Sequence, residues 1–229
     1  MSDMVATLER SAGASGVGPT QHGAAARSGV APVARSAAKR ALDVVGALVA
    51  LLLFLPLMLA IAVAVRVETG GPVIFRQRRT GHRGQVFTIF KFRTMTVAED
   101  SHGVRQATRN DARVTAVGGL LRKLSLDELP QILNVLRGDM SLVGPRPHAL
   151  AHDEAFGAVI EDYDGRFRTR PGLTGLAQVN GLRGEIHGLQ DMAARVAADN
   201  SYIDQWSLAL DLAILARTAA VIFRDPQAY

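Results

Sequence analysis

The chain has 229 residues, and its 26 lysines and arginines outnumber its 21 acidic residues, while cysteine is absent. This length suits one domain with its own hydrophobic core and some additional segments. The lack of cysteine excludes disulfide bonds, thiolate metal sites and a cysteine nucleophile. The positive charge favours anionic partners such as phospholipid headgroups, nucleotides or nucleic acid.

Residues 1–36 are rich in alanine, glycine and serine and show little hydrophobic periodicity, so they are predicted to form a disordered tail. Three of its glycines, Gly13, Gly16 and Gly18, superficially resemble a glycine-rich nucleotide loop. No strand pattern precedes them and no helix pattern follows, which excludes that assignment. The tail also lacks the apolar core and the cleavage site of a signal peptide.

A membrane segment is predicted next, because the 22 residues from Val44 to Val65 contain no charge. As a helix this run is about 33 Å long, against roughly 30 Å of bilayer hydrocarbon. Pro56 lies near its middle and would kink a helix there. Both flanks are basic: Arg35, Lys39 and Arg40 come before the run, and Arg66, Arg76, Arg78, Arg79 and Arg83 come after it.

A helix that spans a membrane usually has its lysines and arginines concentrated on the cytoplasmic side, and this segment shows no such asymmetry. We therefore favour a re-entrant helix over residues 37–70 that enters and leaves by the same face, with a spanning helix as the alternative. A bend at Pro56 needs protein or headgroup contacts, because exposed backbone groups are costly in lipid. The remainder, residues 71–229, is predicted to be a membrane-associated cytosolic domain.

Residues 73–75 and 85–92 have the pattern of two short strands, and the basic segment between them, RQRRTGHRG, indicates a turn. A hairpin just beyond the membrane segment could place its arginines against lipid phosphate, and a solvated basic turn is an equally good interpretation. Lys91 and Arg93, at the end of the second strand, are better placed to bind a ligand.

The most informative stretch runs from Leu121 to Pro147 and contains the adjacent carboxylates Asp127 and Glu128. A Ser-x-x-Glu capping box at Ser125, followed by apolar residues at helical spacing, predicts that the pair lies at the start of a helix. Gly138 is the predicted stop, and Pro130 either bends the helix or sits in its first turn. Basic residues flank the pair: Arg122 and Lys123 before it, and Arg137 and Arg146 after it.

Three interpretations of this acidic pair remain open on the residues alone. Glu128 can complete the capping box while Asp127 is an ordinary acid of the first turn, favoured by the helix dipole. The pair can bind a metal ion. Alternatively, Asp127 can be a nucleophile that the dipole and the nearby arginines keep ionised beside a phosphoryl group. Neighbouring helical residues diverge by about 100°, so one carboxylate can attack while the other holds a cation.

The remaining segments give weaker signals. Residues 96–111 are predicted to be a loop, and residues 114–123 a short helix that brings Arg122 to the acidic pair. Residues 148–162 are expected to be helical; His148 and His152 have the spacing of half a zinc site, but no third ligand stands out. A glycine- and proline-punctuated loop over residues 168–181 carries Gln178 and Asn180 and could approach a ligand closely.

Residues 190–217 are predicted to be largely helical. The later part, YIDQWSLALDLAILARTAAVIF, is rich in leucine, isoleucine and alanine. It is either a core helix or an amphipathic helix on the bilayer surface, with Tyr202 and Trp206 at headgroup level.

Together these pieces closely resemble the bacterial sugar transferases, the monotopic polyprenyl-phosphate phosphoglycosyl transferases. The matching strings are KRALDVV, KFRTM, LRKLSLDELPQILNVLRGDMSLVGPRP, RPGLTGLAQVNG and YIDQWSLALDL, in the family's order, over residues 39 to 224. Any one of them is modest, and their combination is specific. Many members have additional transmembrane helices near the N-terminus, so the chain is expected to be a minimal form with a single anchor.

The resemblance implies that the chain transfers a sugar-1-phosphate from a UDP-sugar to polyprenyl (undecaprenyl) phosphate and releases UMP, which initiates exopolysaccharide or another surface glycan. By the match, Asp127 would form an aspartyl-phosphosugar intermediate and Glu128 would hold Mg²⁺. Arg122 and Arg146 would bind phosphate oxygens. The resemblance also suggests that Lys91, Arg93, Gln178 and Asn180 line the substrate site.

The resemblance further implies an α+β, mostly helical fold with a re-entrant membrane helix kinked at Pro56, a small β-hairpin and amphipathic surface helices. The expected location is the inner membrane, with the active site on the cytoplasmic face. One departure is Leu55, where family members often have a serine that can bond to carbonyls freed by the proline.

An inactive, membrane-tethered scaffold of glycan assembly is the alternative function, and the intact acidic pair with its arginines argues against it. Nucleic-acid binding rests only on net charge and lacks a recognition motif, so no nucleic-acid partner is expected. The sequence is compatible with a homodimer. It names neither the sugar, nor the glycan pathway, nor the role of the tail.

Overall fold

A computed structural model describes residues 31–96, 111–184, 186 and 188–224. Most of the predicted tail and the predicted 96–111 loop lie outside these residues. The last residues of the predicted tail are ordered, since Pro32–Arg35 form the short helix α2 and the Val33 side chain is only 1% exposed. This helix lies within the segment that the sequence predicted to be disordered.

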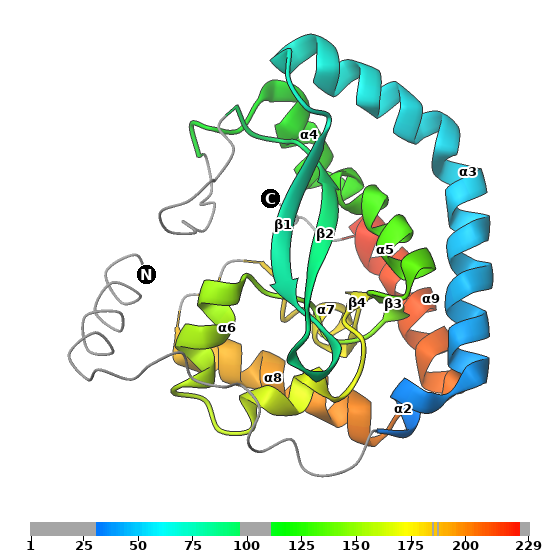
Figure 1. The fold of residues 1–229 in the computed structure, drawn as a ribbon, viewed down its shortest axis with the longest axis vertical. Coiled ribbons are helices and arrows are strands. Elements are labelled where there is room, and N and C mark those ends of the chain that lie inside the picture. The colour runs from blue at the N-terminus through cyan, green and yellow to red at the C-terminus, as the bar shows by residue number, and fades with distance from the viewer. Residues whose placement is uncertain (1–30, 97–110, 185, 187, 225–229) are drawn as a thin grey trace.

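The longest element is helix α3, Ala37–Thr69, which contains the whole apolar run. The Ser36 side chain accepts a hydrogen bond from the Lys39 amide at its start, and Gly70 ends it in the left-handed conformation, with φ of 66°. Pro56 lies inside this single helix. Figure 1 shows that α3 bends along its length, so that its second half turns over the end of the hairpin.

The predicted hairpin is confirmed, with strands β1 (Ile74–Thr80) and β2 (Val86–Phe92) pairing antiparallel from Ile74 opposite Phe92 to Thr80 opposite Val86. Strand β1 extends through most of the segment expected to be the turn. The turn itself is limited to residues 81–85, which include the short 3₁₀ helix η1, His82–Gly84. The three arginines of β1 follow the alternation of side chains along the strand: Arg76 and Arg78 are exposed, and Arg79 is half-buried.

The rest of the described chain is mostly helical and adds one small parallel pair of strands, which confirms the mostly helical α+β class. The predicted helix at 114–123 is confirmed, the one at 148–162 is shorter, and the one at 190–217 is interrupted at residues 205–207. In chain order the elements are α4 (Ala116–Lys123), η2 (Leu126–Gln131), α5 (Ile132–Arg137), β3 (Ser141–Val143), α6 (Leu150–Gly157), η3 (Tyr163–Arg168), β4 (Gly172–Thr174), α7 (Leu176–Val179), α8 (Leu189–Asp204) and α9 (Leu208–Arg224).

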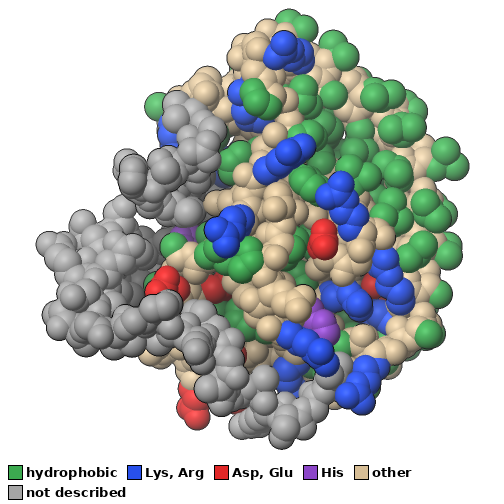
Figure 2. Space-filling model, viewed as in Figure 1, with side chains coloured by type: hydrophobic (Ala, Val, Ile, Leu, Met, Phe, Trp, Pro, Cys, Tyr) green, Lys and Arg blue, Asp and Glu red, His purple; other side chains and the backbone are tan. Residues whose placement is uncertain are grey.

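Both halves of α3 pack against the domain on one side and expose apolar side chains on the other. Ala47, in the first half, is fully buried in the main core with residues of α5, β3 and α9. Ile61 and Val65, in the second half, are buried against Phe92 and Leu121. Figure 2 shows apolar side chains along the outer edge formed by α3. The most exposed ones are Val45, Val49, Leu52, Leu53, Leu59, Val63 and Val67.

Among the described residues, α3 is the one helix long and apolar enough to cross a membrane, with a mean hydropathy of 3.0 over its most apolar window. Only 11% of that window is buried within the protein. A core helix would bury its apolar surface inside the fold, so this surface calls for an apolar environment outside it.

A buried polar network joins the start of α3 to the C-terminal helices. The Lys39 ammonium lies 2.9 Å from the Asp211 carboxylate and 3.6 Å from that of Asp43. Asp211 also accepts hydrogen bonds from the Tyr202 hydroxyl (2.7 Å) and the Trp206 indole (3.1 Å). Tyr202 is only 1% exposed, so of the two alternatives for this segment the core helix is the correct one at this residue and the position at headgroup level is wrong. The hydrogen-bond partner of its hydroxyl is the buried Asp211 and not a group at the membrane surface.

Replacing Asp43 by alanine is expected to destabilise the protein by about 3 kcal/mol or more, because it leaves buried groups without partners. The Asp43 carboxylate accepts hydrogen bonds from the Ser141 hydroxyl (2.8 Å) and the Leu142 amide (2.9 Å). Thermal unfolding of the purified protein measures the effect. The substitution Glu161→Ala, at an exposed acid in the segment after α6, is the control and should unfold close to wild type.

Candidate active site

The acidic pair lies on a 3₁₀ helix, and the predicted capping box is wrong. Helix α4 ends at Lys123, and Ser125 then adopts the left-handed conformation, with φ of 54°, and makes no side-chain capping hydrogen bond. An N-cap residue needs an extended backbone, so this tight turn precludes the capping box. Its effect is to place the last turn of α4, with Arg122, directly before Asp127 and Glu128.

Glu128 is held by two cations that come from distant parts of the chain. The Lys91 ammonium lies 2.7 Å from its Oε1. The Arg146 guanidinium binds both carboxylate oxygens, with Nη1 3.0 Å from Oε2 and Nη2 2.5 Å from Oε1. Such paired contacts are the strong, oriented form of the arginine–carboxylate interaction. The structure thus brings together three residues that the sequence assigned to the site.

The pKa values of the Asp127 and Glu128 carboxyl groups are shifted in opposite directions. For Asp127, burial and the neighbouring charge of Glu128 raise the pKa to about 6, against the opposing charges of Lys91, Arg122 and Arg146. For Glu128, burial opposes ionisation, but Arg146 and Lys91 together hold the pKa well below its usual range. Two adjacent acids with separated pKa values are typical of a site in which each has its own role.

Lys91 is positioned by a side chain that the sequence analysis did not single out. Asn134, on α5, is fully buried and bonds along the edge of β2, where it accepts from the Phe90 amide (3.0 Å) and donates to the Thr88 carbonyl (2.7 Å). These bonds fix the strand just before Lys91 against the helix that follows the acidic pair. A polar residue within the otherwise apolar string ILNVL was the signal that could have revealed it.

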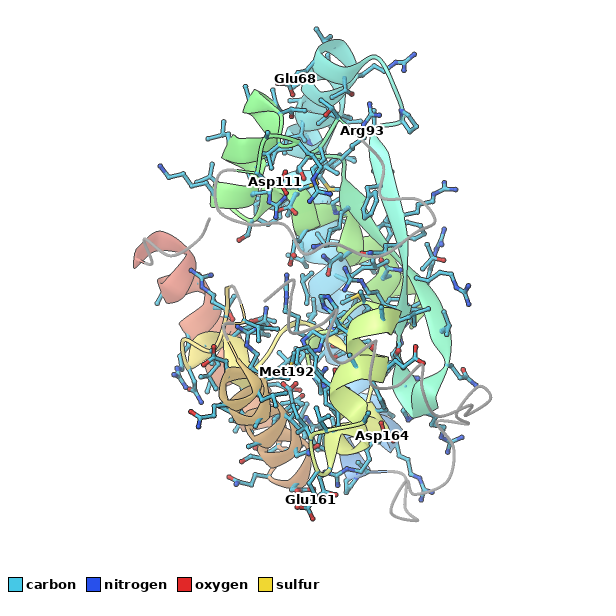
Figure 3. The ribbon with its side chains drawn as sticks, turned by 90° about the vertical axis from the view of Figure 1, so that its left-hand side faces the viewer. Glu68, Arg93, Asp111, Glu161, Asp164 and Met192 are labelled. Atoms are coloured by element: carbon cyan, nitrogen blue, oxygen red, sulfur yellow. The ribbon has the colours of Figure 1, made fainter. Side chains whose placement is uncertain are left out.

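Arg93 lies elsewhere. Its guanidinium donates to the Thr69 hydroxyl, at the end of α3, and its backbone amide donates to the Val73 carbonyl. Figure 3 shows Arg93 at the same end of the molecule as Glu68 and Asp111. The described contacts of Arg93 therefore tie the end of the apolar helix to the hairpin and include none with the acidic pair.

Gln178 and Asn180 also have partners away from the pair. The Gln178 amide donates weakly to the Leu173 carbonyl (3.3 Å), and the Asn180 carbonyl oxygen accepts from Arg217 on α9 (2.9 Å). No described hydrogen bond joins either residue to Asp127 or Glu128. Gln178 Oε1 is buried without a hydrogen bond, which leaves it an acceptor to satisfy.

The two histidines that suggested half a zinc site do not form one. His148 is buried, and its Nδ1 lies within hydrogen-bonding distance of the Tyr163 hydroxyl and of Arg166. Burial and the charge of Arg166 lower the pKa of His148 well below its usual value. His152 packs edge-on against Phe156. The described residues include no group of three or more potential metal-binding side chains.

The donor set at the acidic pair nevertheless suits magnesium. Mg²⁺ commonly takes one or two carboxylates from the protein and fills its other positions with water and substrate phosphate oxygens. Asp127 and Glu128 are two partly buried carboxylates that are adjacent in the sequence, and the charge of Glu128 helps to raise the pKa of Asp127. Both oxygens of Glu128 are engaged by Lys91 and Arg146, so a metal ion would replace one of these contacts.

Comparison with known proteins agrees with this chemistry. The family model of the bacterial sugar transferases matches residues 34–225. A UDP-glucose:undecaprenyl-phosphate glucose-1-phosphate transferase of Caulobacter vibrioides is 54% identical over 191 residues, which are 83% of this chain and 72% of that protein. The protein of the same name in Escherichia coli K12 is 50% identical over 83% of this chain, which spans 41% of its length. The exopolysaccharide production protein ExoY of Rhizobium meliloti is 46% identical over 81% of this chain and 85% of its own.

The family match covers the membrane helix, the hairpin, the acidic pair and the C-terminal helices together. The chain shares about half of its residues with the Caulobacter and Escherichia proteins over four fifths of its length, and proteins this similar have the same fold. The chain therefore belongs to the bacterial sugar transferase family and is a phosphoglycosyl transferase by class.

Proposed function

We propose that the protein transfers a sugar-1-phosphate from a UDP-sugar to undecaprenyl phosphate and releases UMP, as the first step of a surface glycan such as an exopolysaccharide. The observation that carries this proposal is the site itself: a carboxylate pair in which Glu128 is clamped by Lys91 and Arg146. The names of the relatives make UDP-glucose the first donor to test.

The first step is attack by the Asp127 carboxylate on the sugar-linked phosphorus. An oxygen–phosphorus bond forms to Asp127, the bond to the bridging oxygen of the diphosphate breaks, and UMP leaves with that oxygen. In the second step an oxygen of undecaprenyl phosphate attacks the same phosphorus, and the Asp127 carboxylate is released. Two displacements let one site accept two bulky and dissimilar substrates in turn. The raised pKa of Asp127 gives a more basic and hence stronger attacking group once it is ionised.

The cations of the site serve the phosphates. Arg146 and Lys91 hold Glu128 in the described structure, and each can turn to a phosphate oxygen when the diphosphate enters. Arg122, whose charge lowers the pKa of Asp127, would make a third contact. Glu128 would hold Mg²⁺, which supplies positive charge that offsets the negative charge of the diphosphate.

The proposed reaction is tested by UMP release from a panel of UDP-sugars, with undecaprenyl phosphate and Mg²⁺. Release with one or two donors, UDP-glucose among them, is the expected result. If no donor in a broad panel releases UMP while the folded protein still binds the membrane, the reaction is wrong and the scaffold alternative replaces it.

We further propose that α3 is re-entrant, with the domain on the cytoplasmic face of the inner membrane. The support is that Ala47 and Val65, near the two ends of the apolar run, are both buried against the same domain. A straight helix that crossed about 30 Å of hydrocarbon would carry one end away from that domain. The bend in Figure 1 and the internal Pro56 allow both ends to return to one side.

Single cysteines test this arrangement without background, because the chain has none of its own. Ala38 and Pro72 are exposed and flank the apolar run, so Ala38→Cys and Pro72→Cys should both react with an impermeant maleimide in inside-out vesicles and neither in right-side-out ones. Leu52→Cys, in the middle of the run, is the control that should resist labelling from both sides. Labelling of the two flanking cysteines from opposite sides would establish a spanning helix instead.

A further inference from the structure

A buried arginine outside the acidic site supports the segment that carries Arg146. Arg166 lies on η3 and is 3% exposed. Its Nη2 donates to the backbone carbonyl of Arg146 (2.6 Å), 20 residues away in the sequence, and to Asp199 on α8 (2.8 Å). The arginine thus joins two elements of the domain to the chain between β3 and α6.

The same guanidinium is fixed from its other side. Its Nη1 lies 3.1 Å from the Tyr163 hydroxyl and 2.5 Å from His148 Nδ1. The Tyr163 hydroxyl in turn donates to Asp153 (2.7 Å). A planar fork with five N–H donors can serve four partners in one plane, which the single ammonium of lysine cannot do. The carboxylates of Asp153 and Asp199 both pair with the buried guanidinium of Arg166, and a buried charge needs such partners.

The backbone on either side of Arg146 is already restrained by other means. Pro145 and Pro147 flank it and fix their own φ angles. The Pro145 carbonyl accepts from the Gly172 amide (2.8 Å), and the Gly144 amide donates to the Thr174 carbonyl (2.9 Å). A Cβ at Gly144 would lie 2.5 Å from the Arg170 carbonyl, so the close approach needs glycine. The carbonyl of Arg146 itself is the group that Arg166 holds.

We propose that Arg166 is a positioning residue for the transfer reaction: it fixes the backbone of Arg146 so that the Arg146 guanidinium reaches Glu128 and the substrate phosphate. The proposal rests on the proposed function for the role of Arg146. Being buried, Arg166 touches no substrate itself. A displacement of about 1 Å in a group that orients a reactant can cost about a hundredfold in rate, which is why a remote support matters.

The test compares Arg166→Lys with Arg168→Lys, a matched control two residues away. Arg168 pairs with the exposed Asp204 (2.7 Å) and has no described contact with the site. The transfer rate should fall by about ten- to a hundredfold in Arg166→Lys and stay within about twofold of wild type in Arg168→Lys. An unchanged rate in Arg166→Lys would overturn the proposal.

A double-mutant cycle separates positioning from general damage to the fold. In an Arg146→Lys background, where the guanidinium to be positioned is gone, Arg166→Lys should lower the remaining rate by about twofold or less. A loss as large as that in the wild-type background would mean that the two residues act independently and would overturn the proposal. If Arg166→Lys does not fold, Asp199→Asn replaces it in the same cycle, since it keeps Arg166 and removes the carboxylate that orients it.

Hydrogen exchange measures the support without any reaction. In protein without substrate, Arg166→Lys should speed amide exchange in peptides that cover residues 144–149, and Arg168→Lys should not. Equal exchange in the two variants would overturn the proposal even if wild type transfers sugar phosphate. Faster exchange in Arg166→Lys, with no UMP release by wild type on any donor, would preserve the support of Arg146 and reject the proposed function instead.

Discussion

Asp127→Asn should lower UMP release by at least about a thousandfold, because it removes the attacking carboxylate and retains its shape. The substitution also removes one of the two like charges of the pair, so the fold should be as stable as wild type or slightly more stable. Initial rates with UDP-glucose and undecaprenyl phosphate, together with thermal unfolding, measure the two effects separately.

Asp164→Asn is the matched control for this experiment. Asp164 is an exposed acid on η3, shown at one end of the molecule in Figure 3, and its substitution should leave the rate within about twofold of wild type. Asp127→Asn activity within a few-fold of wild type would remove the nucleophilic role and leave Asp127 as an ordinary acid of the 3₁₀ helix.

Glu128→Gln should lower the rate by about a hundredfold or more and should raise the Mg²⁺ concentration needed for half-maximal activity. The amide cannot bind a metal ion as a carboxylate does. Its one oxygen can still accept from Lys91 and one nitrogen of Arg146, but its NH₂ group cannot accept from the second nitrogen of Arg146, so the paired contact is lost. A titration of initial rate against Mg²⁺, in wild type and variant, gives both numbers.

Glu161→Gln provides the comparison, because Glu161 is exposed in the segment that follows α6. Its Mg²⁺ titration should overlay that of wild type. A reduced rate in Glu128→Gln with an unchanged Mg²⁺ dependence would contradict the assignment of Glu128 to the metal. The residue would then act only by orienting its two cations.

Elements with a strong local pattern were predictable. The uncharged run from Val44 to Val65 lies within one helix, and the alternating string before Arg93 forms β2. The predicted capping box at Ser125 is wrong for a local reason. The turn after α4 holds Ser125 in the left-handed conformation, whereas a capping box requires an extended backbone. Sequence spacing alone cannot show how the preceding helix ends.

The part of the candidate site that consists of residues adjacent in the sequence could be predicted. Asp127 and Glu128 carry the signal themselves, and the structure brings Lys91 and Arg146 to Glu128, whereas the sequence expected these two residues to bind substrate phosphate. The supports were missed because their partners are remote along the chain. The Asp43 carboxylate, for example, meets the Ser141 hydroxyl across 98 residues. Only the packing of helices and strands sets such distances, and no periodicity encodes them.

A covalent mechanism requires that the enzyme retain the sugar phosphate before undecaprenyl phosphate binds. Wild-type protein is incubated with UDP-glucose labelled in the sugar and Mg²⁺, without undecaprenyl phosphate, and then digested for mass spectrometry. A covalent intermediate on Asp127 predicts UMP release of up to one equivalent, a hexose phosphate on the peptide that contains Asp127, and its discharge when undecaprenyl phosphate is added. Release of UMP only when the lipid is present, with no adduct on any peptide, would contradict a covalent intermediate on Asp127.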